Sequence, residues 1–459
     1  MKKIICFIAA TLYTLQAYSQ FSITGTNFVE EKSEISEIKK LFICQGLTNS
    51  ELSFRFSGSS TDISCWSYSK EQNNITAYTD YRVEGNRIVF NSIKDETAYG
   101  VKIGDSDIQF SWLIDYSNHA LKLNSVEAVT GEDACASTKL LINAIAPPLS
   151  YYSSSGYFRE IQREYSATYE SMVWNETDKK FTDTKITETK GIRIPETILS
   201  APVYKNTTFK ITGDQYLTSF GNPQSVESPL YNAVAVSCAA IAKQTSSYSD
   251  NHLGSSSSSA DKEYVAMPVT GDDTPISIEG SAPLNLDLTA TGTVPAAFSY
   301  SWEVASDPDF MDLEAQITDV YSLDNEATFK YPFERAGTFY VRLVTSNHDN
   351  SCETSTNSFQ ITVFESKLEV PNAFSPGSDG INDVFKVAYQ SIIKFKAWVF
   401  NRWGNQLFHW TDPAEGWDGT FNGKIVPPGV YFYVIDAVGS DGRKYKLKGD
   451  INLFHESKK

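Results

Sequence analysis

Histidine is scarce in this 459-residue chain, which contains only five. No two of them have the spacing that lets histidines on one helix share a metal ion, and the metalloprotease pattern HExxH is absent. The GxSxG turn that carries the nucleophile of many hydrolases is also missing. Paired carboxylates are abundant, but at this density they are typical of a solvated surface. The sequence therefore predicts a protein that is not an enzyme, with no catalytic residue and no cofactor.

Basic residues are outnumbered, with 39 Lys and Arg against 56 Asp and Glu, which gives a formal net charge of −17. This balance argues against a nucleic-acid partner, because phosphate contacts need basic patches. The acidity is uneven, since residues 1–20 and 371–459 each carry a net charge of +2 and residues 21–370 carry −21. We expect an acidic, soluble body joined to a nearly neutral C-terminal part.

Long apolar runs are missing except near the N-terminus, where Ile4 to Leu15 follows Lys2 and Lys3. This run is too short to cross a hydrocarbon layer of about 30 Å as a helix. The small residues Ala17-Tyr18-Ser19 follow it, so residues 1–20 are predicted to be a secretory signal peptide cleaved after Ser19 or Gln20. The mature chain is expected to lack a transmembrane span.

Cysteine is also rare. Five cysteines remain outside the predicted signal peptide, at Cys44, Cys65, Cys135, Cys238 and Cys352. In an exported protein some should form disulfides, and we expect one pair among the three in the first domain, although spacing does not say which. The equal alternative is that these thiols are buried as small apolar groups, and this is the interpretation for Cys238.

What the chain does contain is alternation of apolar and polar residues. Leu52, Phe54 and Phe56 alternate with polar neighbours, as in a half-buried strand. Residues 81–90 and 100–112 each read as two strands around a turn that contains glycine. We therefore predict an all-β fold of tandem immunoglobulin-like β-sandwiches ending in a small C-terminal β-sandwich.

Composition shifts divide the chain. The predicted parts are a signal peptide at 1–20, β-rich domains at 21–146 and 147–246, a Ser-rich linker at 247–262, an immunoglobulin-like domain at 263–366 and a C-terminal domain at 367–459. The serine-rich stretch reads either as a linker between domains or as a long surface loop. In 263–366, Trp302 lies on an alternating strand and Ala336 to Val344 is a glycine turn feeding an aromatic strand, which resembles the polycystic-kidney-disease (PKD) family of extracellular domains.

The last 90 residues carry six motifs in a fixed order, namely PNAFSP with DGIND, FNRWG, GWDG, NGK, PPGVYFYVI and SDG with KGDI. This order is similar to the gliding-motility-associated C-terminal domain, the type B sorting domain of the type IX secretion system of the Bacteroidetes phylum. The matching positions are Pro371, Asn372, Phe374, Asp379, Gly380, Asn382, Asp383, Asn401, Arg402, Trp403, Gly404, Trp417, Asp418, Gly419, Gly429 and Tyr431.

The resemblance implies export in two steps, first to the periplasm and then across the outer membrane by a translocon that reads residues 370–459. One departure stands out: Gly377-Ser378-Asp379-Gly380 replaces the usual Asn-Gly-Asp-Gly. Asp379, Asn382 and Asp383 are weak candidates for Ca²⁺ ligands, and a loop that satisfies its own backbone is the plainer alternative. Arg402 is expected to stack on Trp403 or Trp417, or to belong to the surface that the translocon reads.

Together these patterns predict a non-catalytic structural or adhesive protein, secreted or held at the outer-membrane surface, with an unknown protein or glycan ligand. The alternative is a carbohydrate-binding or carbohydrate-processing accessory protein. Its candidate sugar-stacking residues are Tyr151-Tyr152 beside Tyr157-Phe158, or Trp66 and Tyr68, although aromatics in β-proteins pack in cores more often than they bind sugars.

Overall fold

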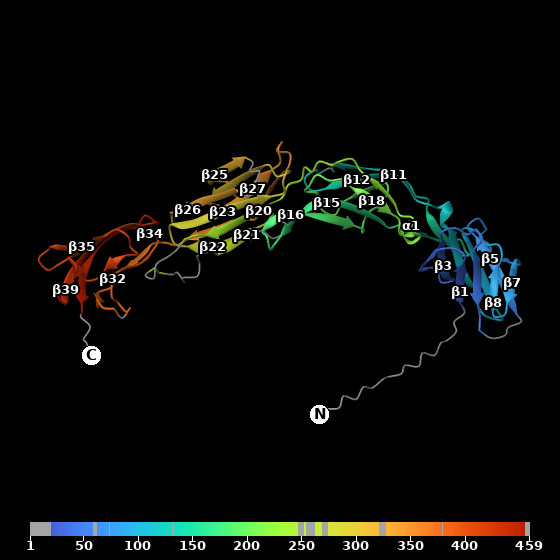
Figure 1. Ribbon diagram of the computed structural model, residues 1–459, viewed down its shortest axis with the longest axis horizontal. Coiled ribbons are helices and arrows are strands. Elements are labelled where there is room, and N and C mark those ends of the chain that lie inside the picture. The colour runs from blue at the N-terminus through green and yellow to red at the C-terminus, as the bar shows by residue number, and fades with distance from the viewer. Residues whose placement is uncertain are drawn as a thin grey trace, which may run out of the picture.

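A computed structural model describes residues 20–57, 62–72, 74–130, 133–246, 252–253, 262–268, 274–320, 327–378 and 380–454. The predicted signal peptide lies outside them except for Gln20, and so does most of the predicted serine-rich linker. The chain forms four β-units that follow one another along an arch (Figure 1). In the described part of the chain, no helix has the length and apolar character needed to cross a membrane.

The first unit is a sandwich of two sheets, with strand orders β1-β4-β8-β7 and β2-β3-β10-β9-β5-β6. Alternation produces it: Leu52 and Phe54 point into the core between the sheets. A 3-10 turn, η1 (Tyr116–Asn118), follows the last strand. The strands are β1 (Gln20–Thr24), β2 (Phe28–Glu31), β3 (Ile38–Cys44), β4 (Glu51–Arg55), β5 (Ile63–Ser69), β6 (Thr76–Ala77), β7 (Tyr81–Glu84), β8 (Arg87–Phe90), β9 (Thr97–Ile103) and β10 (Gln109–Asp115).

The second unit has sheets β11-β12-β17 and β16-β15-β18-β19, with a separate hairpin β13-β14. The Thr-rich strand β16 is an edge strand, as its alternation of threonine and charge predicts. The elements are β11 (Lys122–Thr130), β12 (Thr138–Ile145), β13 (Leu149–Tyr152), β14 (Phe158–Ile161), β15 (Tyr165–Asn175), β16 (Lys180–Glu188), β17 (Glu196–Ile198), β18 (Lys210–Gly213), α1 (Gln215–Ser219) and β19 (Gln224–Glu227).

The third unit packs sheet β21-β20-β23-β26 against a sheet ordered β22-β29-β27-β24-β25, with β28 beside β27. Trp302 on β24 is buried in its core, as expected for an immunoglobulin-like sandwich. The strands are β20 (Cys238–Gln244), β21 (Glu263–Ala266), β22 (Ile276–Gly280), β23 (Leu284–Gly292), β24 (Ser299–Ala305), β25 (Leu313–Val320), β26 (Ala327–Phe333), β27 (Gly337–Ser346), β28 (Glu353–Ser355) and β29 (Phe359–Val363).

The C-terminal unit is built on a five-stranded sheet, β31-β40-β39-β34-β35, with three short strand pairs beside it. Its core includes the buried rings of Phe374, Phe385 and Trp417. The strands are β30 (Lys367–Glu369), β31 (Ala373–Phe374), β32 (Phe385–Lys386), β33 (Ala388–Gln390), β34 (Ile392–Phe400), β35 (Gln406–Trp410), β36 (Gly416–Trp417), β37 (Thr420–Phe421), β38 (Lys424–Ile425), β39 (Gly429–Gly439) and β40 (Lys444–Leu453).

The structure places two segments differently from the predicted boundaries. Residues 122–145, expected in a first domain ending at 146, form a hairpin that pairs with Glu196–Ile198 of the second unit. Residues 238–244, expected in the second domain, pair with β21 and β23 of the third. The described residues on either side of the predicted linker therefore lie on neighbouring strands of one sheet, so the linker does not separate two domains.

The expected disulfide among Cys44, Cys65 and Cys135 is wrong, because Cys135 is bonded to Cys352 in the third unit. Cys44 and Cys65 are free and buried, as is Cys238, whose buried state was predicted. In the sheet of the first unit, β10 and β9 lie between the strands that carry Cys44 and Cys65. Three strand spacings of about 4.8 Å exceed the reach of a disulfide.

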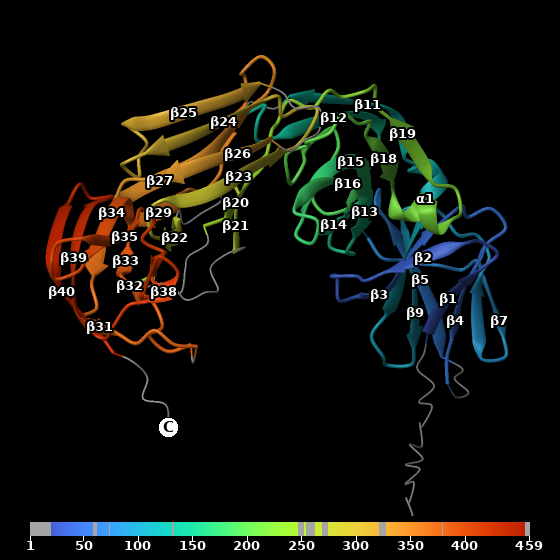
Figure 2. The same ribbon diagram turned by 60° about the vertical axis from the view of Figure 1, so that its left-hand side comes forward.

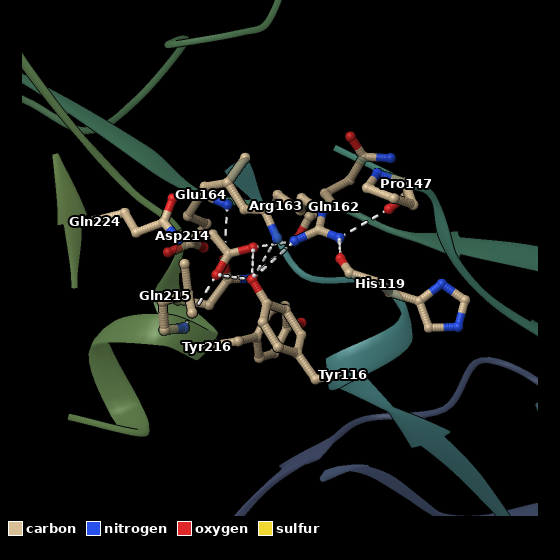
Figure 3. A network of polar contacts seen from close by, with 12 residues as sticks. Tyr116, His119, Pro147, Gln162, Arg163, Glu164, Asp214, Gln215, Tyr216 and Gln224 are labelled. Atoms are coloured by element: carbon tan, nitrogen blue, oxygen red, sulfur yellow. Dashed lines mark hydrogen bonds and ion pairs between the residues drawn. The ribbon is translucent and has the colours of Figure 1, made fainter. Parts of the chain in front are cut away.

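The first two units share one core. One continuous cluster of buried residues runs from Ile35 and Trp112 of the first unit to Tyr216 and Phe220 of the second. Figure 3 shows the polar network beside it, in which Arg163 pairs with Asp214 and the Tyr116 hydroxyl lies 3.0 Å from both oxygens of that carboxylate. Domains joined through a large apolar interface move little relative to one another.

Specific contacts also hold the other two junctions between units. The Cys135–Cys352 disulfide links the second and third units, and the Asn347 side-chain amide donates to the Val234 carbonyl nearby (3.3 Å). Between the third and fourth units, the Ala282 amide donates to the Ser391 hydroxyl (3.1 Å) and the Ala336 amide to the Ser440 carbonyl (3.2 Å). Figure 2, a turned view, shows the units continuing one another at each junction.

Candidate functional site in the C-terminal unit

Three of the motif aromatics form the inner support of the C-terminal unit. Phe374 and Trp417 are buried with ring centroids 5.4 Å apart, and Trp417 packs edge-on against Tyr431 at 5.3 Å. The Trp417 indole N–H donates to the Thr420 carbonyl (2.9 Å) and the Tyr431 hydroxyl to the Pro427 carbonyl (2.6 Å). These residues stabilise the fold and leave little surface for a partner to contact.

A second group of motif residues builds the turns. The Asn401 side-chain oxygen accepts hydrogen bonds from the backbone amides of Trp403 and Asn405, both at 3.0 Å, and Gly404 has φ +82°. The Asp418 carboxylate holds the Thr420 amide and hydroxyl, and Gly419 has φ +78°. These side chains bend the chain between strands, as aspartate and asparagine typically do in turns.

The segment proposed for Ca²⁺ behaves as a turn in the part that is described. The Gly380 amide donates to the Asp383 carboxylate (2.9 Å), and the Ser375 amide donates to the Asn382 carbonyl (3.0 Å). Asp379 lies outside the described residues. Among those residues no group of three or more histidine, cysteine or acidic side chains has an arrangement that could hold a metal ion. Calcium binding here stays a prediction.

The start of the unit is fixed to its last strand. Pro371 and Asn372 are exposed, and the Asn372 carbonyl accepts hydrogen bonds from the Asn452 backbone and side-chain amides. Residues 373–374 then pair in parallel with 452–453. The first and last motifs of the unit therefore meet on one edge of the sheet.

Two motif residues face outward. The Trp403 side chain is 72% exposed, and the Arg402 guanidinium lies over its ring at 4.4 Å from the centroid, which confirms the first of the two expected stacking partners. They form one wall of a hollow of about 450 Å³. Other lining residues include Leu407, Val426, Pro428, Val430 and Phe432. An exposed tryptophan with a stacked arginine beside an apolar hollow is typical of a recognition site.

Sequence reasoning missed the outer face of the sheet next to this hollow. Along β39, Tyr431, Ile435 and Ala437 are buried. On the opposite face of the strand, Val430, Phe432 and Val434 are each more than two fifths exposed. A strand with apolar residues at both odd and even positions is expected to be buried on both faces. Here one face is exposed to solvent. The neighbouring Lys444, Lys446 and Lys448 were the available signal, since a lysine at every second position marks the solvent side of a strand.

Some of the aromatic residues proposed for sugar stacking are buried in the structure and others are exposed. Tyr151 and Tyr68 are buried, and Trp66 and Tyr152 are half-buried. Tyr157 and Phe158 are 50% and 55% exposed, with Phe158 stacked on Tyr152 at 5.7 Å and Arg159 over the Tyr157 ring at 4.4 Å. Two exposed rings therefore remain at the tip of hairpin β13-β14.

Comparison with known proteins identifies two units. Residues 368–453 match the family model described as the CHU_C type IX secretion signal domain, and residues 127–228 match a fibronectin type III domain. The PKD resemblance of 263–366 stays a prediction. No curated protein sequence matches the chain significantly.

Solved structures of tandem β-domains resemble the chain. A tetra-tandem repeat from the extending region of a large adhesion protein is 10% identical, with 89% of this chain and 96% of that one covered and a TM-score of 0.21. Immunoglobulin domains 1–5 of Sidekick-1 are 11% identical, with 95% and 81% covered and a TM-score of 0.23. A Ca²⁺-stabilised adhesin that helps an Antarctic bacterium bind ice is 9% identical, with 89% and 94% covered and a TM-score of 0.17.

The two matched domain types fit the all-β architecture and are typically non-catalytic. A type IX secretion signal implies recognition by that secretion system and export to the cell surface or the medium. The C-terminal unit of this chain is therefore a CHU_C type IX secretion signal domain, carried behind a fibronectin type III domain in a multidomain β-protein.

Proposed function

We propose that this protein is a non-catalytic adhesive or structural arm, delivered to the outer-membrane surface or the medium by its C-terminal domain. The observation that carries the proposal is the secretion signal domain at 368–453, placed at the end of three β-sandwiches. Delivery begins with the predicted signal peptide and passes through the periplasm. The acidic body keeps the exported arm soluble and separate from its neighbours.

The junctions support a role in holding a binding surface at a distance. Tandem domains with small, polar contacts move freely against each other. Here the first two units share one core, and the second and third are joined by the Cys135–Cys352 disulfide. Such an arm presents its first unit far from its last one (Figure 1).

The test is fractionation of the native cells with an antibody against the first unit. The full-length chain should reach the surface or the medium, and a chain lacking residues 368–459 should accumulate in the periplasm. As a matched gain-of-function control, residues 367–459 fused to an unrelated periplasmic protein should carry it out of the cell. Equal export with and without residues 368–459 would overturn the proposal.

A second candidate function is carbohydrate binding, which the exposed pair Tyr157 and Phe158 favours. Half-exposed rings near a hairpin tip can stack on the apolar faces of sugars. A polysaccharide array probed with the purified chain and with the Y157A/F158A double variant tests it. Binding that the double variant loses would support this candidate, and no binding by the native chain would remove it.

A further inference from the structure

The outer face of the C-terminal sheet combines lysines with exposed apolar side chains. Residues directly opposite each other on paired strands share a face. Lys446 and Lys396 lie opposite Asp436 of β39, and Lys444 and Lys394 lie opposite Val438. These two rows form the basic half of the face.

The next rows are apolar. Lys448 and Trp398 lie opposite Val434, and Trp398 is in turn beside His409, with ring centroids 5.2 Å apart. Phe432 lies between Asp450 and Phe400. We call the outward side chains of β34, β39 and β40 together the lysine–aromatic face.

Among the residues that the structure describes, the cations of this face have no ion-pair partner. Lys394, Lys396, Lys444, Lys446 and Lys448 are all exposed, and none forms a salt bridge within the part of the chain that the structure describes. Arg402, beside this face, likewise forms no salt bridge in that part of the chain, and its guanidinium lies over the Trp403 ring. Five lysines without a salt bridge among the described residues, against Asp436 and Asp450, leave the face basic.

The hollow beside Arg402 and Trp403 opens onto the apolar end of the same face, because Val430 and Phe432 belong to both. The face therefore offers three features in sequence, namely a basic half, a strip of exposed and half-buried rings and a concave end. Interfaces between proteins typically centre on Trp, Tyr, Phe and Arg, with charged groups around them.

We propose that the lysine–aromatic face is the surface through which the type IX translocon binds this domain, and that the translocon presents there an acidic protein surface with an apolar side chain that enters the hollow. The inference rests on the proposed function, since it names the partner chemistry of the same domain. Positive charge on the face selects a negatively charged partner and speeds its encounter. The hollow then fixes the register of the complex.

A protein fits this surface better than an anionic membrane does. Two carboxylates, Asp436 and Asp450, lie among the lysines and would be repelled by lipid phosphates. A concave end needs a protruding side chain to fill it, and a lipid surface presents none. A second copy of this chain has an acidic body too, so self-association is measured as a separate outcome.

The experiment measures export of the full-length chain in its native cells. The K446E/K448E variant reverses two charges of the face, and W403A removes the exposed wall of the hollow. We expect the ratio of exported to periplasmic protein to fall about tenfold or more in each, as for loss of central contacts in a protein interface. K446R/K448R keeps both charges and should be exported normally, and K424E, an exposed lysine on β38, is the charge-reversal control off this face.

The outcomes separate the two proposals. If removal of 368–459 blocks export but K446E/K448E and W403A are exported normally, the face is not the binding surface and the proposed function stands. If removal has no effect, the proposed function itself fails. Unchanged melting temperatures show that the variants fold. Binding of the purified chain to phosphatidylglycerol vesicles, or dimers in sedimentation velocity, either one lost in K446E/K448E, would overturn the proposal in favour of a membrane or a second copy.

Discussion

Arg163 and Asp214 form an ion pair whose side chains are only 7% and 0% exposed, at the junction between the first and second units. The carboxylate also accepts hydrogen bonds from the Tyr116 hydroxyl and from the backbone amide of Leu217 at the start of α1. The guanidinium donates to the Pro147 carbonyl (2.8 Å) and to that of His119. One buried pair thus ties strand, helix and loop together where two domains meet (Figure 3).

The substitution Asp214→Ala should destabilise this junction strongly. It leaves the Arg163 charge buried without its carboxylate, which typically costs about 3–5 kcal/mol. Calorimetry of the full chain should show a lower melting temperature for the transition of the first two units. Asp183→Ala is the matched control, because the Lys205–Asp183 pair is exposed and such pairs contribute about 0–1 kcal/mol. Equal shifts for the two variants would contradict the assignment.

Near the same junction, His119 makes stability depend on pH. Its Nε2 lies 3.0 Å from the Asp95 carboxylate, and this hydrogen bond raises the pKa of His119 above its usual value of about 6.5. The stabilisation is therefore complete below about pH 6.5 and is lost as the pH rises through the raised pKa.

Asp95 sets the lower end of the pH range in which this pair stabilises the fold. Burial acts to raise the pKa of Asp95, but hydrogen bonds from His119, Asn118 and the Asp115 amide outweigh it, so the pKa is lowered. Its contribution is present above about pH 4 and is lost as the pH falls through the lowered pKa. Urea titrations should show that His119→Gln removes part of the decline above pH 6.5, whereas the exposed His409→Gln in another unit leaves it unchanged. The same decline in both variants would exclude this pair as its source.

Reduction of the Cys135–Cys352 bond should loosen the angle between the second and third units without unfolding either, because each has its own core. Small-angle scattering should report a broader range of distances between the units. The free energy of unfolding should fall by about 2–5 kcal/mol. The C135S/C352S variant should give the same scattering as the reduced protein, and adding reductant should not change it. A native chain whose scattering is unaffected by reductant would disprove the mechanical role.

Gly419→Ala should destabilise the secretion domain. An alanine there would have φ +78° and a Cβ 2.5 Å from Pro376 Cγ, so the steric clash adds to a backbone cost of about 1–2 kcal/mol. Gly423→Ala is the control, since Gly423 has φ +76° but open space around its Cβ. Thermal unfolding followed by tryptophan fluorescence should show the larger drop for Gly419→Ala, and a larger drop for Gly423→Ala would contradict the packing argument.

The three free thiols should resist modification. Burial raises the pKa of Cys44, Cys65 and Cys238 to about 12 each. Because the thiolate is the reactive form, iodoacetamide at pH 8 should label none of them in the native chain and all three after unfolding. Mass spectrometry of the labelled protein checks this, and rapid native labelling of any one would show that its strand opens.

Local patterns predicted much of this fold. Alternation at Leu52, Phe54 and Phe56 gave the right buried side of β4, and the hairpins at 81–90 and 100–112 are present. Pairing between strands or cysteines that are far apart in the chain could not be predicted from the sequence. Pro147-Pro148 reads as a domain end, but β12 finds its partner β17 some fifty residues later. The partner of Cys135 is 217 residues away, and no local spacing encodes that distance.

The candidate site was predicted in part. The motif order located the secretion domain, and stacking of Arg402 on Trp403 followed from their adjacency. The lysine–aromatic face was not foreseen because Val430, Phe432 and Val434 look like core residues in sequence. Which side of an apolar strand remains open depends on whether another layer covers it, and that is a property of the tertiary structure.

The bond between Cys135 and Cys352 also changes the topology of the polypeptide. Once it forms, the stretch between these residues is a closed ring of covalent bonds and not a thread. A ring cannot be pulled through a narrow pore one residue at a time, because two chain segments must enter together. If the bond forms in the oxidising periplasm, the route out of the cell has to admit at least two chain segments side by side.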